Sequence, residues 1–378
     1  MTPNPVVAAI TGTGLWNAPE VITNDELVAS FNEYVRIQNE RNSAAIASGA
    51  AVALEPSSVE FIEKASGIRQ RYVIDRRGVL DPERMRPYFA PRPNDQLSLQ
   101  VEIALGAARD ALAMARREAA DIDLVIIACA NMQRAYPAMA VELQQALGAS
   151  GYAYDMNVAC SSATFGIEQA ANAIRSGTSR AALVVSPEIT SAHLDWRDRD
   201  SHFIFGDVCT AVVLEDAARA RVSARFDILG TKLATKFSNN IRNNAGFLGR
   251  CEDVDRNAPD QLFVQEGRKV FKEVCPMVVE HIGSHLAQLG IDPQSVRRYW
   301  LHQANLNMNL FITRKLLGTN PGRERAPVIL DEYANTASAG SIIAFHRHGE
   351  GLTAGDIGVI CSFGAGYSIG CVVVQRVQ

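Results

Sequence analysis

The stretch "YAYDMNVACSSATFGIEQAANAIRSG", residues 152–177, decides our interpretation of the fold. It begins as a short apolar strand, passes through a turn of small residues and continues as an amphipathic helix. Cys160 stands at the junction, directly before the helix. Because free N–H groups at a helix N-terminus carry partial positive charge, we expect them to lower the pKa of the Cys160 thiol and favour the nucleophilic thiolate. The alternative is a small buried apolar residue, since free cysteines are often buried.

The composition indicates an ordinary globular protein. The chain has 378 residues, of which 47% are hydrophobic and 21% charged, and its net charge of −4 argues against a nucleic-acid binder. The first residues lack a secretory signal, and no apolar run reaches the roughly eighteen residues that begin to span a membrane. Seven cysteines without a C-x-x-C pair are typical of reduced thiols. We therefore expect a cytoplasmic protein.

Outside residues 152–177, strand patterns alternate with helix patterns. Apolar runs predict strands at "PVVAAITGTG" (5–14), "DLVIIACANM" (123–132) and "RAALVVSPEI" (180–189). Apolar residues at helical spacing predict helices at 23–35, with Thr23 or Asn24 as the N-cap, and at 98–119. Residues 40–58 are rich in Ala and Ser without a clear period, and we interpret them as a partly helical insertion.

The second part of the chain repeats the order of the first. A helix pattern at 265–291 leads to a strand at 297–308, as 98–119 leads to 123–132. "HFIFGDVCTAVVLEDA" (202–217) and "DIGVICSFGAGYSIGCVVVQRV" (356–377) each have a Phe-Gly turn between apolar runs, which predicts a hairpin in both places. This self-similarity predicts a duplicated α/β unit of about 170 residues. We expect an N-terminal half at 1–217 and a C-terminal half at 218–378.

Two further polar residues lie where ligand-binding groups are expected in α/β folds. His302 follows the apolar residues Tyr-Trp-Leu at the carboxyl end of a predicted strand. Asn335, in "DEYANTASAGS", lies in a tight turn of small residues before a helix. Each residue has a structural alternative, because either one would also serve as a helix cap. The combination of Cys160, His302 and Asn335 favours catalysis more than any one of them does.

The chain resembles the ketoacyl-acyl-carrier-protein synthase III branch of the thiolase-fold superfamily. The resemblance rests on six segments: "GIRQRY" (67–72), "ACSS" (159–162) after Asp155, "FIFGDVCTAVVL" (203–214), "HQAN" (302–305), "NTASAGS" (335–341) and "SFGAGYSIG" (362–370). Together these segments extend over most of the chain apart from residues 40–58. The resemblance implies a duplicated thiolase-like α/β fold of five layers, α-β-α-β-α, with two mixed sheets.

The family's reaction is a decarboxylative condensation in two stages. The resemblance implies that Cys160 is acylated by a thioester such as acyl-CoA, and that a malonyl thioester on acyl carrier protein then loses carbon dioxide. His302 and Asn335 would supply neutral donors to the resulting enolate oxygen. The backbone N–H groups of Cys160 and Ala365 would bind the second oxyanion. The product would be a 3-oxoacyl carrier protein for fatty acid or specialised acyl synthesis, and the reaction needs no metal or redox cofactor.

Other residues match family positions that contact the substrates. The resemblance implies that Phe61, Arg199 and Asn305 contact the CoA or its pantetheine arm. Phe61 stands where the family has a tryptophan that stacks on the adenine, and Ala65 replaces an arginine on the other side of that ring. This weakens the expected adenine site. Ala365 stands where a glycine is usual, and its Cβ restricts the turn.

Three residues match family positions outside the catalytic centre. Arg314 and Lys315 correspond to the basic region that docks the carrier protein, although Asn307 replaces an arginine there. Tyr136 matches a position that reaches across a homodimer interface to close the acyl pocket. The resemblance therefore implies a homodimer that binds acyl-CoA and acyl carrier protein.

Several alternatives share part of this pattern. A papain-like protease also has the order Cys, His, Asn, but it requires a C-G-[SA]-C-[WY] signature that is absent around Cys160. A CoA-dependent polyketide or head-to-head acyl-condensing enzyme would have the same three residues on the same fold. A non-condensing acyltransferase needs only the thiol, and a non-catalytic subunit of this fold has no use for all three residues.

Overall fold

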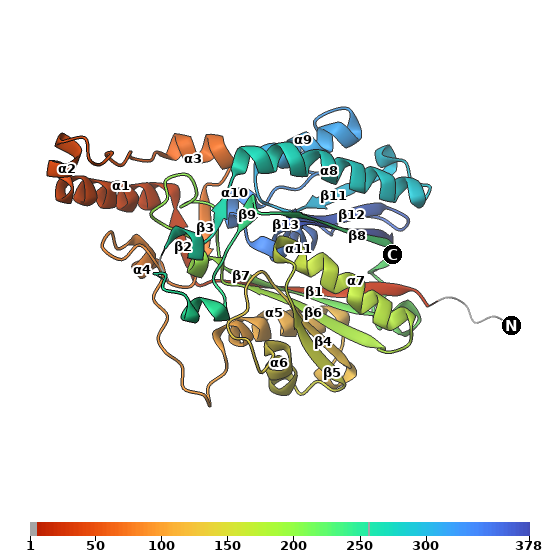
Figure 1. Ribbon diagram of the computed structural model, residues 1–378. Coiled ribbons are helices and arrows are strands. Elements are labelled where there is room, and N and C mark those ends of the chain that lie inside the picture. Colours follow the sequence, from red (N-terminus) through yellow and green to blue (C-terminus); the bar gives the residue numbers. More distant parts are fainter. Residues whose placement is uncertain (1–5, 256–257) are drawn as a thin grey trace.

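A mixed sheet of nine strands forms the centre of the molecule in the computed structural model, which describes residues 6–255 and 258–378 (Figure 1). The strand order is β11-β12-β13-β8-β1-β7-β6-β4-β5. Its strands are β1 (Ala8–Asn17), β4 (Leu124–Ala128), β5 (Tyr152–Met156), β6 (Ala181–Glu188), β7 (Val208–Asp216), β8 (Arg225–Ser238), β11 (Arg298–Leu301), β12 (Ile357–Gly364) and β13 (Gly366–Val377). The predicted strand at 5–14 is β1, and Pro5 lies outside the described residues.

The prediction of two separate sheets is wrong in one respect. The strands form two groups, one of β11, β12, β13 and β8 and the other of β1, β7, β6, β4 and β5. β1 pairs with β8 through Ala9 with Asp227 and Ile10 with Phe226, and this short contact joins the two groups into one sheet. β4 is parallel to both β5 and β6, and β11 is parallel to β12, whereas the remaining strand pairs are antiparallel. The predicted mixed α/β architecture is therefore confirmed.

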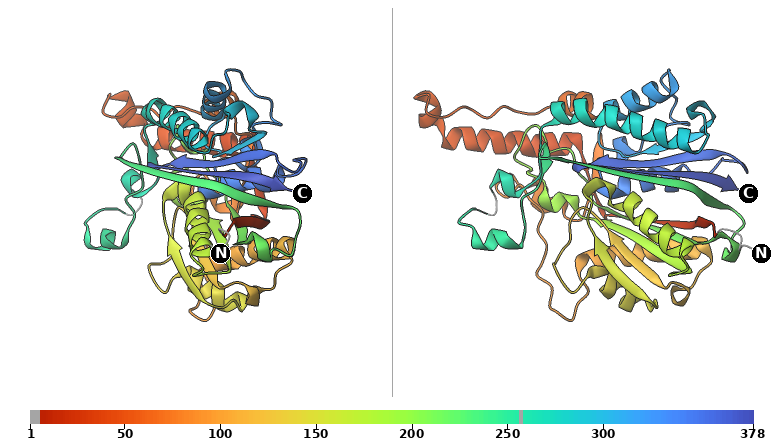
Figure 2. Two further views of the ribbon diagram at one scale, coloured as in Figure 1. Left: turned by 90° about the vertical axis from the view of Figure 1, so that its right-hand side faces the viewer. Right: turned by 45° about the vertical axis from the view of Figure 1, so that its right-hand side comes forward.

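Six helices cover or separate the two groups of strands (Figures 1 and 2). α5 (Leu99–Ala115) and α6 (Met139–Leu147) share an apolar core with the outer face of β4, β6 and β7. α7 (Ser162–Arg175) and α11 (Gly340–Arg347) lie between the two groups and share a core with both. α8 (Gly267–Gln288) and α9 (Leu306–Leu317) cover the outer face of β11, β12 and β13.

The remaining elements lie beside the large sheet. They are β2 (Glu20–Thr23), α1 (Asn24–Arg41), α2 (Ser43–Ala47), α3 (Val59–Ser66), β3 (Gln70–Val73), α4 (Arg76–Leu80), β9 (Ile241–Arg242), β10 (Val264–Gln265) and α10 (Leu330–Tyr333). Six of them, β2, α1, α3, β3, α4 and α10, form a fourth apolar core with residues 194–205. Thr23 is the N-cap of α1, as predicted, in a capping box with Glu26. The segment 40–58 is partly helical, as predicted, and α2 projects from the body of the molecule (Figure 1).

The two predicted hairpins have different outcomes. Residues 356–377 form the antiparallel pair β12 and β13, as predicted. Residues 202–217 contain only β7, so the predicted hairpin there is wrong. Instead, the Asn335 N–H donates to the Ile204 carbonyl at 2.9 Å, and the Gly206 N–H donates to the Asn335 carbonyl at 3.1 Å. This segment therefore holds the asparagine loop in place.

Candidate active site

Cys160 lies in a sharp turn between β5 and α7. The side-chain oxygen of Asn157 accepts a hydrogen bond from the Ala159 N–H at 2.8 Å, and the Ser162 hydroxyl accepts one from the Val158 N–H at 2.8 Å. Ala159 has a φ of +47°, in the left-handed region that residues with a Cβ rarely adopt. The hydrogen bonds stabilise this turn, and it places the thiol at the start of α7, as the sequence predicts.

The hairpin of β12 and β13 approaches the thiol closely. A Cβ on Gly364 would lie 2.6 Å from the Cβ of Cys160 and 2.9 Å from its Sγ, so only glycine fits at this position. The backbone N–H groups of Ala365 and Cys160 lie near enough to the sulfur to act toward a lower pKa of the thiol. The left-handed conformation of the turn falls on Gly366, with φ of +124°. Ala365 has no such φ, so its Cβ does not strain the turn.

The expected lowering of the thiol pKa is not observed. Burial and the nearby Glu188 carboxylate raise the pKa of Cys160 to about 12, although the two backbone N–H groups act in the opposite direction. The helix N-terminus is thus outweighed by loss of solvent and by a buried acid that the sequence analysis did not consider. The neutral thiol therefore predominates at neutral pH.

His302 follows β11 directly and is only 2% exposed. Its backbone N–H donates to the Cys361 carbonyl at 2.8 Å, and its ring packs edge-on against Phe363. Burial lowers the pKa of His302 from 6.5 to about 4. Its Nδ1 has no hydrogen-bond partner in the described part of the chain. The imidazole is therefore neutral at neutral pH and retains an N–H donor.

Asn335 is fixed by both its backbone and its side chain. Its side-chain oxygen accepts a hydrogen bond from the Ala337 N–H at 2.9 Å. No hydrogen bond within residues 6–255 and 258–378 engages its amino group, so the N–H donors of the amide are available. The flanking residues Ala334 and Ala337 have φ of +57° and +46°. Such conformations cost free energy and persist where the surrounding structure holds them in place, often at functional sites.

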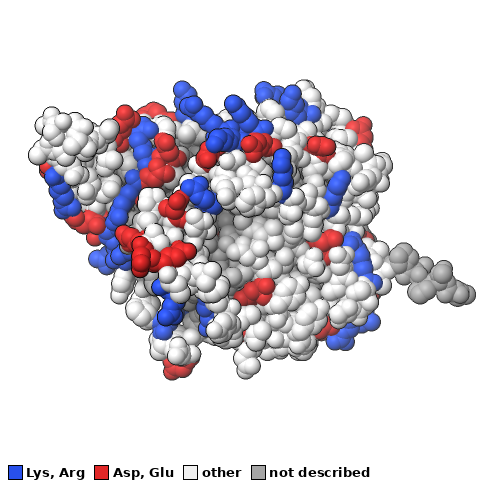
Figure 3. All heavy atoms as spheres, in the orientation of Figure 1, with Lys and Arg blue, Asp and Glu red and all other residues white. Residues whose placement is uncertain are grey.

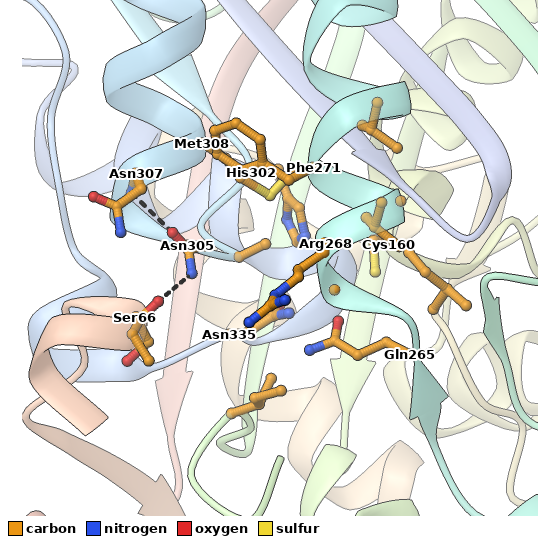
Figure 4. A pocket seen from close by; sticks show the side chains of 18 of the residues that line it. Ser66, Cys160, Gln265, Arg268, Phe271, His302, Asn305, Asn307, Met308 and Asn335 are labelled. Carbon is orange, nitrogen blue, oxygen red and sulfur yellow. Dashed lines mark hydrogen bonds between the residues drawn. The ribbon is translucent and has the colours of Figure 1, made fainter. Parts of the chain in front are cut away.

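The three predicted catalytic residues, Cys160, His302 and Asn335, line one pocket of about 530 Å³. Their side chains reach this pocket from three different segments of the chain (Figure 4). Its other lining side chains are mostly apolar, among them Phe203, Phe263, Val270, Phe271, Met308 and Phe363. Arg268 and Lys272, at the start of α8, also line it and are exposed. Figure 3 shows a hollow in this face of the molecule, with Lys and Arg side chains above it over α8 and α9. The pocket thus combines an apolar wall with a basic rim.

Glu188, which the sequence analysis missed, is a buried acid at the end of β6. Burial raises the pKa of Glu188 to about 7, although hydrogen bonds from Ser338 and Ala130 act in the opposite direction. A signal was present, because a single acid follows the apolar run of residues 181–187. An acid in a buried strand is uncommon unless it has partners.

The three predicted CoA contacts lie at or beside the pocket. The Arg199 guanidinium lies 4.2 Å from the centre of the Phe61 ring, and its Nε donates to the Pro56 carbonyl at 2.8 Å. The two side chains that would flank an adenine therefore contact each other directly. Asn305 lines the pocket, but its side chain caps α9 and donates to the Ala65 carbonyl at 2.7 Å.

The remaining predicted positions are on the surface. Arg314 and Lys315 are exposed in the last turn of α9. Tyr136 is 84% exposed in the loop before α6 and does not line the pocket of its own chain. No helix in the described part of the chain is long and apolar enough to cross a membrane.

This combination of a mixed α/β fold with a thiol, a neutral imidazole and a carboxamide in one pocket defines a thiolase-fold condensing enzyme. Residues 154–236 match the family model of 3-oxoacyl-[acyl-carrier-protein] synthase III, and residues 286–376 match the model of its C-terminal part. The chain is 60% identical over 347 residues to a β-ketodecanoyl-[acyl-carrier-protein] synthase of Pseudomonas aeruginosa, and the alignment covers 92% of this chain and 99% of the relative. The chain belongs to the 3-oxoacyl-[acyl-carrier-protein] synthase III family.

Solved structures show the same fold. The 3-oxoacyl-[acyl-carrier-protein] synthase III of Aquifex aeolicus is similar with a TM-score of 0.74 and 25% identity, over 97% of this chain and 99% of that one. The priming β-ketosynthase of the R1128 polyketide pathway has a TM-score of 0.77 at 22% identity, over 100% and 99% of the two chains. At that identity the second likeness shows the fold alone. The chain is accordingly an acyltransferase that condenses acyl thioesters.

Proposed function

We propose that Cys160, His302 and Asn335 catalyse the family's condensation, with the acyl group held on Cys160. In the first stage the Cys160 sulfur attacks the thioester carbonyl of the donor, the thiol proton passes to the departing thiolate, and an acyl-enzyme forms. The backbone N–H groups of Cys160 and Ala365 are placed to bind the oxyanion of this step, because both already reach the sulfur.

In the second stage a malonyl thioester loses carbon dioxide and its electron pair moves onto the thioester oxygen. The neutral His302 imidazole and the free amide of Asn335 donate hydrogen bonds to this enolate. Each such donor contributes about 2.7–4 kcal/mol of transition-state stabilisation. The enolate carbon then attacks the acyl carbonyl on Cys160, the thiolate leaves, and a 3-oxoacyl thioester is released.

The single observation that supports this proposal is the convergence of the three side chains on one pocket with His302 neutral. Stabilising an enolate oxygen does not require a protonated imidazole, because a neutral imidazole also donates a hydrogen bond. A thiol protease, in contrast, needs a thiolate paired with an imidazolium. Here burial keeps both the Cys160 thiol and the His302 imidazole uncharged. The pair therefore favours condensation over protease chemistry.

A medium-chain acyl donor is the substrate that we propose. The Pseudomonas aeruginosa relative is named for a β-ketodecanoyl product. Decarboxylative condensation adds two carbons, so a ten-carbon product requires an eight-carbon donor. The apolar wall of Phe203, Phe263 and Phe271 suits a chain of this kind. We propose acyl-CoA as the donor, with Phe61 and Arg199 separating to admit the adenine and Asn305 contacting the pantetheine arm.

We propose that acyl carrier protein docks on the basic rim of the pocket. Arg268 and Lys272 on α8, together with Arg314 and Lys315 on α9, are exposed and have no carboxylate within ion-pair distance in the described part of the chain. Unpaired cations of this kind attract an acidic partner and increase its rate of association.

The proposed quaternary and domain organisation follows the family. We propose a homodimer in which the exposed Tyr136 of one subunit closes the acyl pocket of the other. We also propose that residues 1–217 and 218–378 are the two halves of a duplicated, five-layered fold. The arrangement of α7 and α11 between the two groups of strands supports this division.

Intact-protein mass spectrometry with a panel of acyl-CoA thioesters tests this function. We expect a mass increase on Cys160 that is greatest with the octanoyl donor, and none in Cys160→Ala. The Cys160→Ala protein should still release carbon dioxide from a malonyl thioester, because its enolate donors remain. If Cys160→Ala loses decarboxylation while acylation persists at another residue, the assignment of roles is wrong.

A further inference from the structure

A single buried carboxylate, that of Glu188, is hydrogen-bonded directly to the loop that bears Asn335 and, through Ala130 and Asn157, to the turn that bears Cys160. It comes from a third element, β6, and its side chain is on the protein side of the pocket wall, since Glu188 does not line the cavity. Only 1% of its surface is exposed. It therefore acts on the site through other residues, without contact with the substrate.

The nucleophile turn is connected to Glu188 through Ala130 and Asn157. The Ala130 N–H donates to the carboxylate at 3.0 Å. The Ala130 carbonyl accepts a hydrogen bond from the side-chain amino group of Asn157 at 2.8 Å. The other side-chain atom of Asn157 binds the N–H of Ala159, the residue before Cys160. This series of bonds holds the left-handed conformation of Ala159.

The asparagine loop is connected to the same carboxylate through Ser338. The Ser338 N–H donates to Glu188 at 3.1 Å, and the Ser338 hydroxyl donates to the same oxygen. Ser338 follows Ala337, whose N–H fixes the side-chain oxygen of Asn335 and whose φ is +46°. Because all of the groups around the carboxylate are donors, an acceptor-only side chain is required here.

The charge of Glu188 also reaches the thiol. It is one of the two causes that raise the pKa of Cys160, after burial. The other ionisable groups around Glu188 are Asp207 and the buried thiols of Cys129 and Cys209. Both of those thiols have a pKa raised well above the usual value, so they stay neutral. Burial raises the pKa of Asp207 to about 6, so it is largely ionised at pH 8.

We propose that Glu188 is a positioning residue that holds the nucleophile turn and the asparagine loop in their relative placement. This proposal rests on the proposed role of Asn335. Decarboxylation tests the positioning role, and alkylation of Cys160 is a second measurement on the same enzyme.

The test compares Glu188→Gln with the parent enzyme at pH 8 by two measurements. The first is the rate at which iodoacetamide alkylates Cys160, followed by peptide mass spectrometry. We expect this rate to rise about threefold or more, because one buried negative charge beside the sulfur is removed. The second is the release of carbon dioxide from a malonyl thioester. We expect kcat to fall about tenfold or more with little change in KM, because the new amino group faces donors and releases the asparagine loop.

Ser338→Ala is the matched variant, because it removes the hydroxyl bond to Glu188 and keeps both the carboxyl group and the backbone Ser338 N–H bond. We expect decarboxylation to fall in Ser338→Ala, and the alkylation rate of Cys160 to rise less than in Glu188→Gln. A variant that merely unfolds would also lose decarboxylation and would expose Cys160 to faster alkylation, so the result counts only for a variant that keeps the circular dichroism spectrum and melting temperature of the parent. If Glu188→Gln fails to fold, Ser338→Ala alone still decides the positioning role.

Two outcomes would overturn the proposal. One is a Glu188→Gln enzyme with unchanged alkylation and decarboxylation rates. The other is normal decarboxylation in Ser338→Ala. Asn335→Asp distinguishes failure of the role of Glu188 from failure of the proposed function. If Asn335→Asp also decarboxylates at the parent rate, the proposed role of Asn335 is wrong. If Asn335→Asp loses decarboxylation, only the proposed role of Glu188 is wrong.

Discussion

At the scale of single residues, the proposed chemistry depends on keeping polar groups uncharged. His302 and Asn335 present neutral donors, and the Cys160 thiol is held neutral by burial and by Glu188. The sequence was sufficient to predict these three residues, because each follows a strand or precedes a helix. The raised thiol pKa was not predictable, because Glu188 and the burial of the sulfur come from segments distant in sequence.

The proposed role of the Asn335 carboxamide in decarboxylation can be tested by a nearly isosteric substitution. Asn335→Asp keeps the oxygen that binds the Ala337 N–H but places a negative charge against the developing enolate. We expect malonyl decarboxylation to fall about a hundredfold or more. The measurement is carbon dioxide release, with acylation of Cys160 as the control that should be retained. An unchanged rate of decarboxylation would remove Asn335 from the mechanism.

The protonation state of His302 has a spectroscopic test. Because the pKa is lowered from 6.5 to about 4, the ring signals of His302, assigned with His302→Gln, should not titrate between about pH 8 and about pH 5.5. The unfolded chain binds this proton below about pH 6.5 and the native chain does not. The contribution of His302 to stability is therefore complete above about pH 6.5 and is lost as the pH falls toward about 4. A titration centred near pH 6.5 would contradict a neutral donor.

At the scale of elements, the sequence predicts a helix or strand correctly where the spacing of its apolar residues matches the face that it buries. The helices α5 and α7 and the β12–β13 hairpin agree with the sequence prediction. The hairpin predicted at 202–217 failed because Phe203, Ile204 and Phe205 are buried in a core formed by distant elements. Their apolar pattern resembles a strand, but the backbone there pairs with the Asn335 loop.

The closeness of the β12–β13 hairpin to the thiol predicts the effect of one added methyl group. In Gly364→Ala the new Cβ would lie within 3 Å of the Cys160 side chain, so the hairpin or the thiol has to shift. We expect the rate of Cys160 acylation to fall about tenfold or more while the circular dichroism spectrum stays native.

Ala365→Gly is the matched control for Gly364→Ala in the same turn. It keeps the backbone N–H and should leave acylation within about twofold of the parent, since Ala365 has no left-handed φ. Equal acylation rates in Gly364→Ala and the parent enzyme would show that the close approach is unimportant.

At the scale of the whole molecule, five of the six family-like segments contribute residues to one pocket although they are spread over the sequence. Cys160 comes from one half of the chain, and His302, Asn335 and the hairpin come from the other. The repeated order of elements predicts a duplication, which stays a prediction. The pairing of β1 with β8, which joins the strands into one sheet, was not visible in the sequence, because only two residues of each strand make it.

The basic rim predicts a selective effect on the carrier-bound substrate. Reversing the charges of Arg314 and Lys315 to Glu should raise KM for malonyl-carrier protein about fivefold or more, and the effect should shrink at high salt. Acylation by a CoA thioester is the internal control and should change by less than about twofold, because neither residue lines the pocket and both are exposed. Equal effects on both substrates would argue against a docking surface.

The most direct measurement of the central claim is a single-turnover chase from the acyl-enzyme. The protein is first loaded with an octanoyl group from octanoyl-CoA, and malonyl-carrier protein is then added. The account predicts that the octanoyl mass on Cys160 disappears as a 3-oxodecanoyl group appears on the carrier protein. An octanoyl group that never forms on Cys160, or that stays there while the malonyl group is decarboxylated, would contradict it.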